Sequence, residues 1–509
     1  MGVPDPASRF QPGDVHGVSE VLNPAAFPWA DDGWRGRPWA ETVLYELHVG
    51  SFSPGGDFAG VEGRPAHLAA LAVTAVELMP VADFPGARNW GYDGALPFAP
   101  DARYGRPEDL KHLVQAAHAR GLMVFLDVVY NHFGPEGNYL HLYAPRFFDQ
   151  ERHTPWGAAI NFDGPDSHWV RRFFIHNALY WLEEYHLDGL RLDAVHAIAD
   201  RSRPDFLEEL AAAVAAGPGA ERQVHLVLEN DDNAAHYLEE GYRAQWSDDL
   251  HHALHLLITG EDDGYYQDYR DDPVAHLGRS LAEGFAYQGE TSAYRQGRRR
   301  GEASGHLPPE AFVGFLQNHD QVGNRAFGER IADLAAPQAV VAATAVVLLS
   351  PQPPLLFMGQ EWGTRTRFPY FCDFEPDLAG AVTAGRRGEF KGFQQFEDPA
   401  ARERIPDPGA PETFRQARLD WDELEDPEAR QWLRLHRELL ALRREVITPL
   451  AGGFGAGAGS WRPLGGRALE VTWSLRDGRA LVLVANLGDR PQPDSPAPGR
   501  RLYATNQEE

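Results

Sequence analysis

The sequence contains a single cysteine, Cys372, among 509 residues. One cysteine cannot form a disulfide within the chain, so packing and hydrogen bonds must hold the fold together. The residues after Met1 supply neither the basic start nor the apolar stretch of a secretory signal peptide. We therefore expect a protein of a reducing compartment, the cytoplasm.

Long apolar runs and an excess of positive charge are also missing. The longest apolar stretch, roughly residues 339–349, is too short to cross a lipid bilayer. The formal net charge is -27 at pH 7, and such a chain is repelled by nucleic acids and by acidic membrane surfaces. We expect a soluble protein with no nucleic acid and no membrane as a partner. A neutral ligand such as a sugar meets no electrostatic obstacle.

Short β-like runs alternate with helical patterns along most of the chain. The predicted strands cover residues 43–49, 75–79, 123–129, 189–192, 224–228, 244–246, 313–316 and 355–357. Helical patterns lie between them, for example at residues 107–120 and 169–184. Strands that alternate with helices form parallel sheets, and eight such units close into a barrel. The predicted fold is therefore α/β, a (β/α)8 TIM barrel.

The chain divides into three predicted parts. They are an N-terminal segment at residues 1–40, the barrel at residues 41–445, and a small C-terminal β domain at residues 446–509. The barrel includes a long loop insertion after strand three, residues 131–168, and insertions of that length are usually functional. The Gly-rich run at residues 452–459 is interpreted as a linker. Strands are predicted beyond it at residues 468–474 and 480–486.

Three carboxylates come at the ends of predicted strands. Gly189-Leu190-Arg191-Leu192-Asp193, Leu226-Val227-Leu228-Glu229 and Gln317-Asn318-His319-Asp320 carry them. Barrel enzymes build their sites at the C-terminal ends of several strands, so these groups should converge. Cleavage of a glycosidic bond needs one carboxylate to attack the anomeric carbon and a second to protonate the leaving oxygen. A third carboxylate can stabilise the positive charge of the transition state, so the set predicts a glycosidase.

A single aspartate at a strand end is more often a helix cap or a salt-bridge partner than a catalytic group. The neighbouring residues favour catalysis here. Arg191 lies two residues before Asp193 and points the same way on a strand, and a guanidinium there keeps Asp193 ionised. Glu229 follows an apolar run with no basic neighbour in the sequence. Partial burial is therefore expected to raise its pKa, as a general acid requires.

These segments, with Asp127-Val128-Val129-Tyr130-Asn131-His132 before them, resemble in order the four signature regions of the α-amylase family of glycoside hydrolases. The resemblance implies a retaining mechanism in which Asp193 is the nucleophile, Glu229 the general acid/base and Asp320 the transition-state stabiliser. It also implies sugar contacts from His132 and His319 and a stacking platform from Tyr92. Structural roles for the two histidines, and core packing for Tyr92 and for Trp156 in the insertion, stay open as alternatives.

Some members of this family bind calcium through an asparagine that matches Asn131. The carboxylates that would surround such an ion are not evident in this sequence. We therefore predict no metal and no cofactor.

Longer segments resemble one branch of the family, the malto-oligosyltrehalose trehalohydrolases. They are residues 45–52, 131–139, 245–252, 317–325 and 357–362, within a similarity that runs from about residue 5 to 450. The resemblance implies hydrolysis of the α-1,4 bond next to the terminal trehalose of maltooligosyltrehalose. It also implies maltooligosaccharides as ligands and a metabolic partner, maltooligosyltrehalose synthase, without physical association. The predicted substrate-binding residues are Tyr92, His132, Trp156, Arg191, His196, Asp248, Asp249, His251, His252, His319, Gln321, Asn324 and Arg325.

Residues 248–252 discriminate best between members of the family. They follow strand six, on the leaving-group side, where their acids and histidines are expected to bond the hydroxyls of a trehalose unit. The alternative is that some of the histidines only brace the loop. Two departures from the branch affect subsites and stability rather than the carboxylates: the sequence starts where a usual N-terminal β-sandwich would end, and the C-terminal β domain is short.

Two other functions remain open at this stage. A glucan branching enzyme or a 4-α-glucanotransferase would use the same three carboxylates but pass the glycosyl unit to a sugar instead of water. The acceptor side around residues 248–252 separates these enzymes from a hydrolase. A non-catalytic glucan-binding protein on the same fold is the less favoured reading, because all three carboxylates are present.

Overall fold

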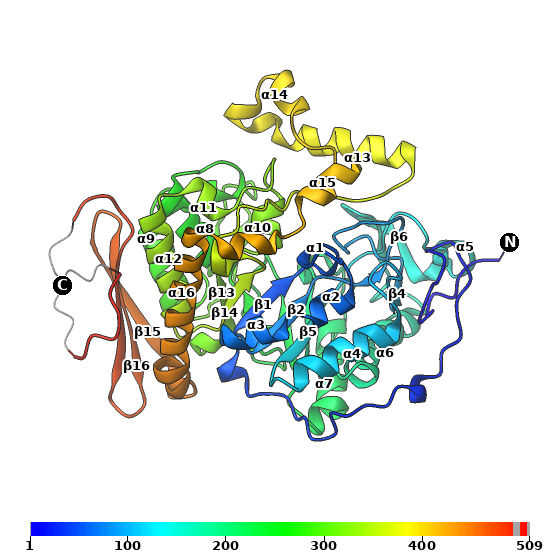
Figure 1. Ribbon diagram of the computed structural model, residues 1–509, viewed down its shortest axis with the longest axis horizontal. Helices are drawn as coiled ribbons and strands as arrows, with labels where there is room; N and C mark the ends of the chain where they lie inside the picture. Colours follow the sequence, from blue (N-terminus) through cyan, green and yellow to red (C-terminus); the bar gives the residue numbers. More distant parts are fainter. Residues whose placement is uncertain (1, 492–498, 506–509) are drawn as a thin grey trace.

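A closed barrel of parallel strands forms the centre of the computed structural model, which describes residues 2–491 and 499–505 (Figure 1). The strand order is β1-β14-β13-β10-β9-β8-β5-β2. The strands are β1 (Leu44–Leu47), β2 (Ala75–Leu78), β5 (Met123–Val128), β8 (Gly189–Leu192), β9 (His225–Leu228), β10 (Ala244–Trp246), β13 (Phe312–Phe315) and β14 (Pro354–Phe357). Each of them lies where a strand was predicted, and the (β/α)8 TIM barrel is confirmed.

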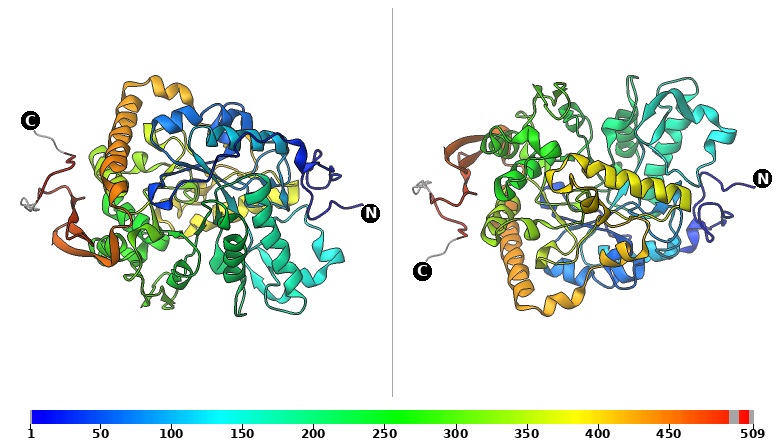
Figure 2. Two further views of the ribbon diagram at one scale, coloured as in Figure 1. Left: turned by 90° about the horizontal axis from the view of Figure 1, so that it is seen from below. Right: turned by 90° about the horizontal axis from the view of Figure 1, so that it is seen from above.

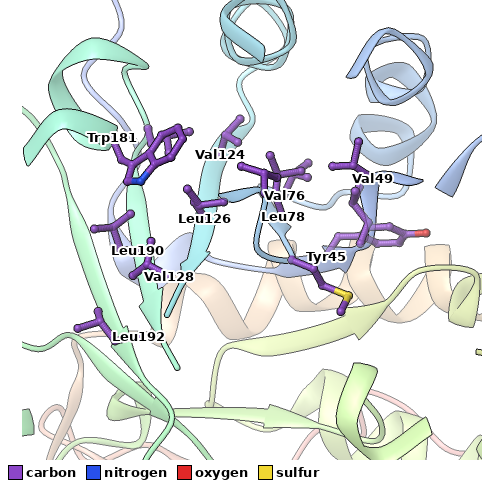
Figure 3. Packing of buried hydrophobic residues seen from close by; sticks show 14 of the residues in the cluster. Tyr45, Val49, Val76, Leu78, Val124, Leu126, Val128, Trp181, Leu190 and Leu192 are labelled. Carbon is purple, nitrogen blue, oxygen red and sulfur yellow. The ribbon is translucent and has the colours of Figure 1, made fainter. Parts of the chain in front are cut away.

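Alternate residues of each strand face the inside and the outside of the barrel. On β1 and β2, Leu44 and Ala75 belong to an apolar cluster inside the barrel. Their neighbours Tyr45 and Val76 belong to the cluster between the strands and the helices, which Figure 3 shows from close by. The base of the barrel is thus filled with apolar side chains, and the inward-facing acids Glu46 and Glu77 of the next layer lie nearer its C-terminal end.

Helices cover the outside of the barrel. They include α4 (Pro107–His118), α6 (Ser167–Glu184), α7 (Phe206–Ala216), α8 (Asp248–Thr259), α12 (Pro337–Leu349) and α16 (Pro427–Leu442). Helix α7 begins with a capping box in which Asp205 accepts from the backbone N–H of Glu208 and Glu208 accepts from that of Asp205. Across residues 2–491 and 499–505, every helix is too short or too polar to cross a membrane.

Two excursions leave the barrel at the C-terminal ends of its strands. The insertion predicted at residues 131–168 contains α5 (Leu140–Tyr143) and the hairpin of β6 (Phe148–Thr154) and β7 (Gly157–Ile160). A second excursion after β14 was not predicted; it contains α13 (Pro376–Glu389), α14 (Pro399–Glu403) and α15 (Pro411–Gln416). Viewed from above, α13 crosses over the barrel (Figure 2). The sequence of this second excursion is rich in Gly and Pro and has the composition of a loop.

The interpretation of residues 452–459 as a linker is wrong. Strand β15 (Phe454–Gly465) includes most of this run and pairs with β16 (Ala468–Leu475), which pairs with β17 (Ala480–Asn486). β15 lies against helix α9 (Pro273–Glu283). A Cβ on Gly459 would stand 2.0 Å from the carbonyl oxygen of Ala282. Glycine here permits close packing of a strand on a helix rather than flexibility. The two later strands were predicted, while the domain boundaries at 40 and 445 remain a proposal.

A buried polar cluster joins the N-terminal segment to the barrel. His118, at the end of α4, lies 2.8 Å from Asp31 through Nδ1 and 3.0 Å from Asp188 through Nε2. Trp34 stacks on the His118 ring and donates its indole N–H to Asp188 at 2.7 Å. Burial lowers the pKa of His118, but the two carboxylates outweigh it, so the pKa lies above its ordinary value. Charged His118 therefore links the segment to the residue that precedes β8.

We expect His118→Gln, which keeps polarity but removes the charge, to lower stability by about 1.5–3 kcal/mol at pH 6. A raised pKa in the folded state means that the contribution is fully present below the unfolded pKa of about 6.5. It is lost as the pH rises through the folded value. Calorimetric melting temperatures should therefore differ most near pH 6 and converge in alkaline buffer. His306→Gln, at an exposed histidine paired with Glu239, is the control, and a difference that grows with pH contradicts the assignment.

Candidate active site

Arg191 of β8 joins two of the three predicted carboxylates. Its Nη1 lies 2.9 Å from Asp193 Oδ1, and its Nη2 lies 2.7 Å from Glu229 Oε2. The guanidinium is fully buried and also binds Asp127 Oδ2 at 2.6 Å. The amide of Asn131 donates to Asp193 Oδ2 at 3.1 Å. Asp193 and Glu229 are therefore held by one planar cation at the ends of adjacent strands, with Asp193 oriented from both sides.

The backbone after β8 adds a second donor to Glu229. Ala194 has a φ of 39°, in the left-handed region, and its N–H donates to Glu229 Oε2 at 2.9 Å. Together with Arg191, it makes Oε2 a hydrogen-bond acceptor. The other oxygen of Glu229, Oε1, has no such contact with Arg191 or Ala194. Glu229 has no basic neighbour along the sequence, but it has one in space, because Arg191 reaches it from the adjacent strand β8.

Asp320 lies beside His319 after β13. Its Oδ2 is 3.4 Å from His319 Nε2, and its Oδ1 accepts from the Asn324 amide at 3.1 Å. Glu46 binds the other side of His319, with the His319 backbone N–H at 3.0 Å and Nδ1 as a direct partner. Burial lowers the pKa of His319, but Asp320 and Glu46 raise it to about 9. His319 is therefore a buried cation that fixes Asp320.

Tyr92 is held as a platform next to these groups. Its hydroxyl donates to Asp127 Oδ2 at 2.6 Å and lies 2.8 Å from His319 Nε2. The ring stacks on the His319 ring with centroids 5.1 Å apart and planes at 23°. The residue is only partly buried, so it offers a surface for stacking on a sugar.

The insertion brings Trp156 to the predicted sugar-binding histidine. Trp156 follows β6, is 49% exposed, and stacks on His132 with centroids 4.6 Å apart and planes at 12°. His132 Nε2 lies 3.0 Å from the carbonyl oxygen of Tyr92, and burial lowers the pKa of His132 to about 4. An exposed indole and a neutral imidazole thus form a second aromatic surface close to Tyr92.

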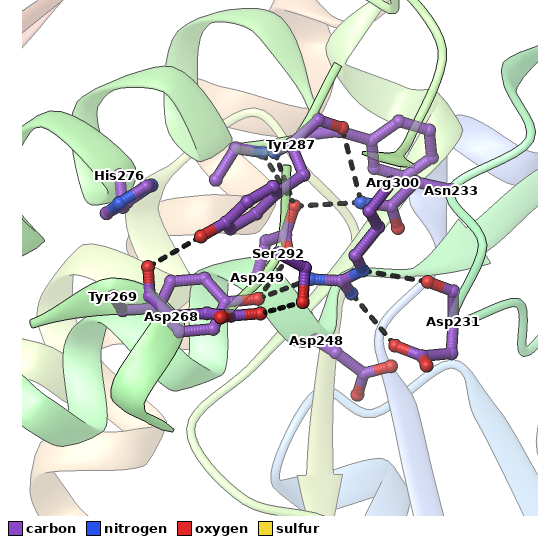
Figure 4. Close-up of polar contacts among 12 residues, drawn as sticks. Asp231, Asn233, Asp248, Asp249, Asp268, Tyr269, His276, Tyr287, Ser292 and Arg300 are labelled. Atoms are coloured by element: carbon purple, nitrogen blue, oxygen red, sulfur yellow. Dashed lines mark hydrogen bonds and ion pairs between the residues drawn. The ribbon is translucent and has the colours of Figure 1, made fainter. Parts of the chain in front are cut away.

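The prediction that Asp249 binds substrate is corrected by the structure. Its Oδ1 accepts from Arg300 Nη1 at 2.8 Å and from the hydroxyl of Tyr269 at 2.5 Å (Figure 4). Its Oδ2 accepts from the Asn233 amide and from the backbone N–H groups of Ala286 and Tyr287. The carboxylate is fully buried and saturated with protein donors, so it stabilises the surrounding loops and is not available to a ligand.

The prediction that His251 binds substrate is corrected in the same way. His252 and Asp248 lie in surroundings that differ from those of Asp249 and His251. His251 is buried, with Nδ1 2.8 Å from the carbonyl oxygen of Leu316 and Nε2 3.1 Å from the Tyr266 hydroxyl, so it braces α8. The His252 ring lies 4.6 Å from that of Tyr265, and burial followed by the charge of Arg300 lowers its pKa to about 3.

Asp248 is partly exposed and points away from the Asp249 cluster in Figure 4. Burial, followed by the charges of Glu229 and Asp231, raises the pKa of Asp248 well above its ordinary value. Gln321 lies 3.5 Å from Asp248 through Nε2, and its Oε1 accepts from the Tyr265 hydroxyl at 3.3 Å. Asp248 and Gln321 are therefore brought to the catalytic carboxylates, together with Tyr265, which the sequence did not suggest.

The remaining predicted contacts differ among themselves. Asn324 is exposed and bonded to Asp320. His196 is exposed, with Nδ1 accepting from the backbone N–H of Asp231 at 3.2 Å. Arg325 is corrected, because its guanidinium is used in a bidentate pair with Glu261 at 2.7 and 2.9 Å.

The fold and the site define a class of protein. The structure is a (β/α)8 barrel with carboxylates after strands four, five and seven, and two of these carboxylates bind one buried arginine. This combination defines an α-amylase-type glycoside hydrolase. Residues 7–146 match the family model of the alpha amylase catalytic domain. Residues 456–509 match a domain of unknown function, DUF3459.

Known proteins define the family further. The malto-oligosyltrehalose trehalohydrolase of Deinococcus radiodurans is 44% identical over 445 residues, which cover 87% of this chain and 72% of that protein. That of Saccharolobus solfataricus is 41% identical over 450 residues, with 87% and 75% covered. A crystal structure from Salmonella typhimurium, of a protein assigned to the alpha amylases, has a TM-score of 0.93 and 45% identity, covering 99% of this chain and 85% of that one. The chain belongs to the malto-oligosyltrehalose trehalohydrolase family.

The neighbours Asp248 and Asp249 should respond differently to the same substitution. Asp249→Ala leaves Arg300 buried without its main partner, and we expect a loss of about 3 kcal/mol or more. Asp248→Ala should leave stability within about 0.5 kcal/mol, as for a partly exposed group away from such a cluster. Thermal unfolding of both variants measures this. Equal melting temperatures for the two would contradict the division of roles.

Proposed function

We propose that the protein hydrolyses the α-1,4-glucosidic bond adjacent to the terminal trehalose unit of maltooligosyltrehalose, releasing free trehalose and a shortened maltooligosaccharide. The observation that carries the proposal is the binding of Asp193 and Glu229 to the single guanidinium of Arg191, in a chain that belongs to the trehalohydrolase family. The arrangement supports a pair of carboxylates with separate roles on one bond.

In the first step, Asp193 attacks the anomeric carbon while Glu229 transfers a proton to the glycosidic oxygen. The C–O bond to the trehalose unit breaks, and a glycosyl ester on Asp193 forms. Ionised Glu229 then removes a proton from water, the water oxygen attacks the anomeric carbon, and the ester bond breaks. Asp193 leaves as a carboxylate and Glu229 regains its proton. A retaining reaction of this kind implies a separation of about 5–5.5 Å between the two carboxyl groups.

The charges around the site support the transition state. Positive charge develops at the anomeric carbon, and Asp320 supplies a third carboxylate against it. The cation His319 fixes Asp320 from one side and the Asn324 amide from the other. Tyr92 offers the flat surface on which the reacting glucose stacks. These groups are in place before substrate binds, so their reorganisation does not add to the barrier.

The leaving-group side carries the choice of substrate. The carboxyl of Asp248, whose raised pKa favours its protonated form, can bond a sugar hydroxyl, and Gln321 and Tyr265 add an amide and a phenol. A site built to bond particular hydroxyls penalises a ligand that lacks them, because its polar groups stay unpaired. We propose that these three residues bind the trehalose unit. We also place the enzyme in the cytoplasm, metabolically downstream of maltooligosyltrehalose synthase.

Glu229→Gln should reduce turnover of maltooligosyltrehalose by roughly a hundredfold or more, because the leaving oxygen loses its proton donor. An α-maltosyl fluoride needs little protonation of its leaving group, and its first step should slow much less. Asp193→Asn is the control, since the loss of the nucleophile slows both substrates alike. The first-turnover rates of fluoride release and of trehalose release, measured before hydrolysis of the glycosyl ester limits turnover, decide the matter. Equal losses for Glu229→Gln would remove Glu229 from the role of acid.

Incubation with maltooligosyltrehalose, with detection of free trehalose, tests the proposed function directly. A maltooligosaccharide of equal length should be cleaved more slowly, by roughly ten- to a hundredfold for two or three unused hydrogen bonds. Asp248→Ala should narrow this gap mainly by slowing the trehalose-ended substrate. Transfer of glycosyl units to a sugar, with no free trehalose, would point to a branching enzyme or glucanotransferase. A wild-type protein without preference would leave a general amylase.

A further inference from the structure

Glu77 lies inside the barrel, one layer below the catalytic carboxylates. It is the third residue of β2, pairs in register with Glu46 of β1 and Phe125 of β5, and faces inward like Ala75. Asp127 lies two residues beyond Phe125 on the same face of β5. Glu77 is therefore at the floor of the site. Its strand, β2, lies between β1, which carries the partner of His319, and β5, which carries a partner of Arg191.

Three neighbouring groups in this layer have unused hydrogen-bonding atoms. Both carboxyl oxygens of Glu77 are buried without a partner in the described chain, and the residue is 1% exposed. Within the part of the chain that the structure describes, Asp127 Oδ1 and Arg191 Nε are likewise buried without a hydrogen-bond partner. Buried polar atoms are almost always hydrogen-bonded. The three sets of atoms belong to groups that interact electrostatically with one another, so a common explanation is required.

The two cations that face Glu77 are already paired with other carboxylates. The charged groups that face it are Glu46, Asp127, Arg191 and His319. Glu46 is paired with His319, and Arg191 serves Asp127, Asp193 and Glu229. A buried carboxylate without a partner is strongly unfavourable, and such a group takes up a proton instead. Burial first, then the charges of Glu46 and Asp127, raise the pKa of Glu77 well above its ordinary value.

A protonated carboxyl has one donor and one acceptor, which complement the two unused atoms above it. We propose that Glu77 is a positioning residue held as a carboxylic acid, whose O–H donates directly to Asp127 Oδ1 and whose C=O accepts from Arg191 Nε through a buried water. An ionised Glu77 has no donor and would leave Asp127 Oδ1 unsatisfied. With Glu77 protonated, both oxygens of Asp127 have hydrogen-bond partners. Asp127 then holds Tyr92 and Arg191 in place and, through Arg191, Asp193 and Glu229. In its kinetic consequence the inference rests on the proposed function.

Two substitutions at Glu77 test the inference. Glu77→Gln keeps a donor, an acceptor and neutrality, so kcat/KM should stay within about threefold of wild type with an unchanged pH–rate profile. Glu77→Leu keeps the volume but removes both polar atoms, so kcat should fall by roughly tenfold or more while KM stays within about twofold. Its melting temperature should also fall, because Asp127 Oδ1 and Arg191 Nε are then left buried without a partner. If Glu77→Gln loses as much as Glu77→Leu, Glu77 acts as a carboxylate, and if Glu77→Leu behaves like wild type, Glu77 only fills space; either result overturns the inference.

Infrared difference spectroscopy of the wild type and Glu77→Gln provides a readout that needs no turnover. At pH 7 the wild type should show the carbonyl absorption of a protonated carboxyl that Glu77→Gln lacks. Loss of carboxylate absorption instead, with no change in the acid band, would overturn the inference even if Glu77→Leu failed to fold. A wild type that shows the acid band but cleaves neither substrate would refute the proposed function and leave the protonation of Glu77 standing.

Discussion

The active site depends on one buried cation, the guanidinium of Arg191. It is fully buried, lies over the indole of Trp246 at 4.1 Å, and binds carboxylates that come from three different strands. A charge in that position is tolerated only because its partners surround it, and the partners are held in turn because only this geometry satisfies the charge. The planar fork of an arginine serves several oxygens at once, which a lysine in the same place could not do. Asp193 and Glu229 therefore take their relative position from a single rigid group at the end of β8.

The surrounding layer contains more carboxyl groups than cations. Glu46, Glu77, Asp127, Asp193, Glu229 and Asp320 face Arg191 and His319. Two of the six, Glu77 and Asp127, have a raised pKa because burial disfavours their ionised form. Burial raises the pKa of Asp127 to about 7 even against the charge of Arg191, which lowers it. A glycosidase of this type needs an acid that holds a proton beside a carboxylate that does not. The raised pKa values of Glu77 and Asp127 show that burial in this layer favours the protonated form of a carboxyl group.

The excursions from the barrel complete the site from the outside. The hairpin of β6 and β7 places Trp156 over His132, and Arg386 of α13 donates to the carbonyl oxygens of Gly323 and Arg325, both at 2.8 Å. The two hydrogen bonds of Arg386 hold the segment that follows Asp320. Residues 248–252 show how supporting and binding roles divide within one short segment. At the start of α8, Asp249 and His251 point into the protein and are saturated there, while Asp248 faces the catalytic carboxylates.

The sequence by itself determined the barrel and the positions of three carboxylates at the ends of its strands. Both are written in local patterns: apolar runs of strand length alternating with helices, and an acid directly after three of these runs. What depends on contacts between distant residues was decided only by the tertiary structure. The approach of Arg191 to Glu229, the saturation of Asp249 by Arg300 and Tyr269, and the pairing of Arg325 with Glu261 join residues from separate strands and loops. Gly459 looked like part of a linker because glycine indicates both flexibility and close packing, and only the position of α9 separates the two. The environment of Glu77 was also decided by the tertiary structure. A glutamate in an apolar strand is visible in the sequence, but the absence of a free cation beside it in the described chain follows from which strands lie next to β2 when the barrel closes.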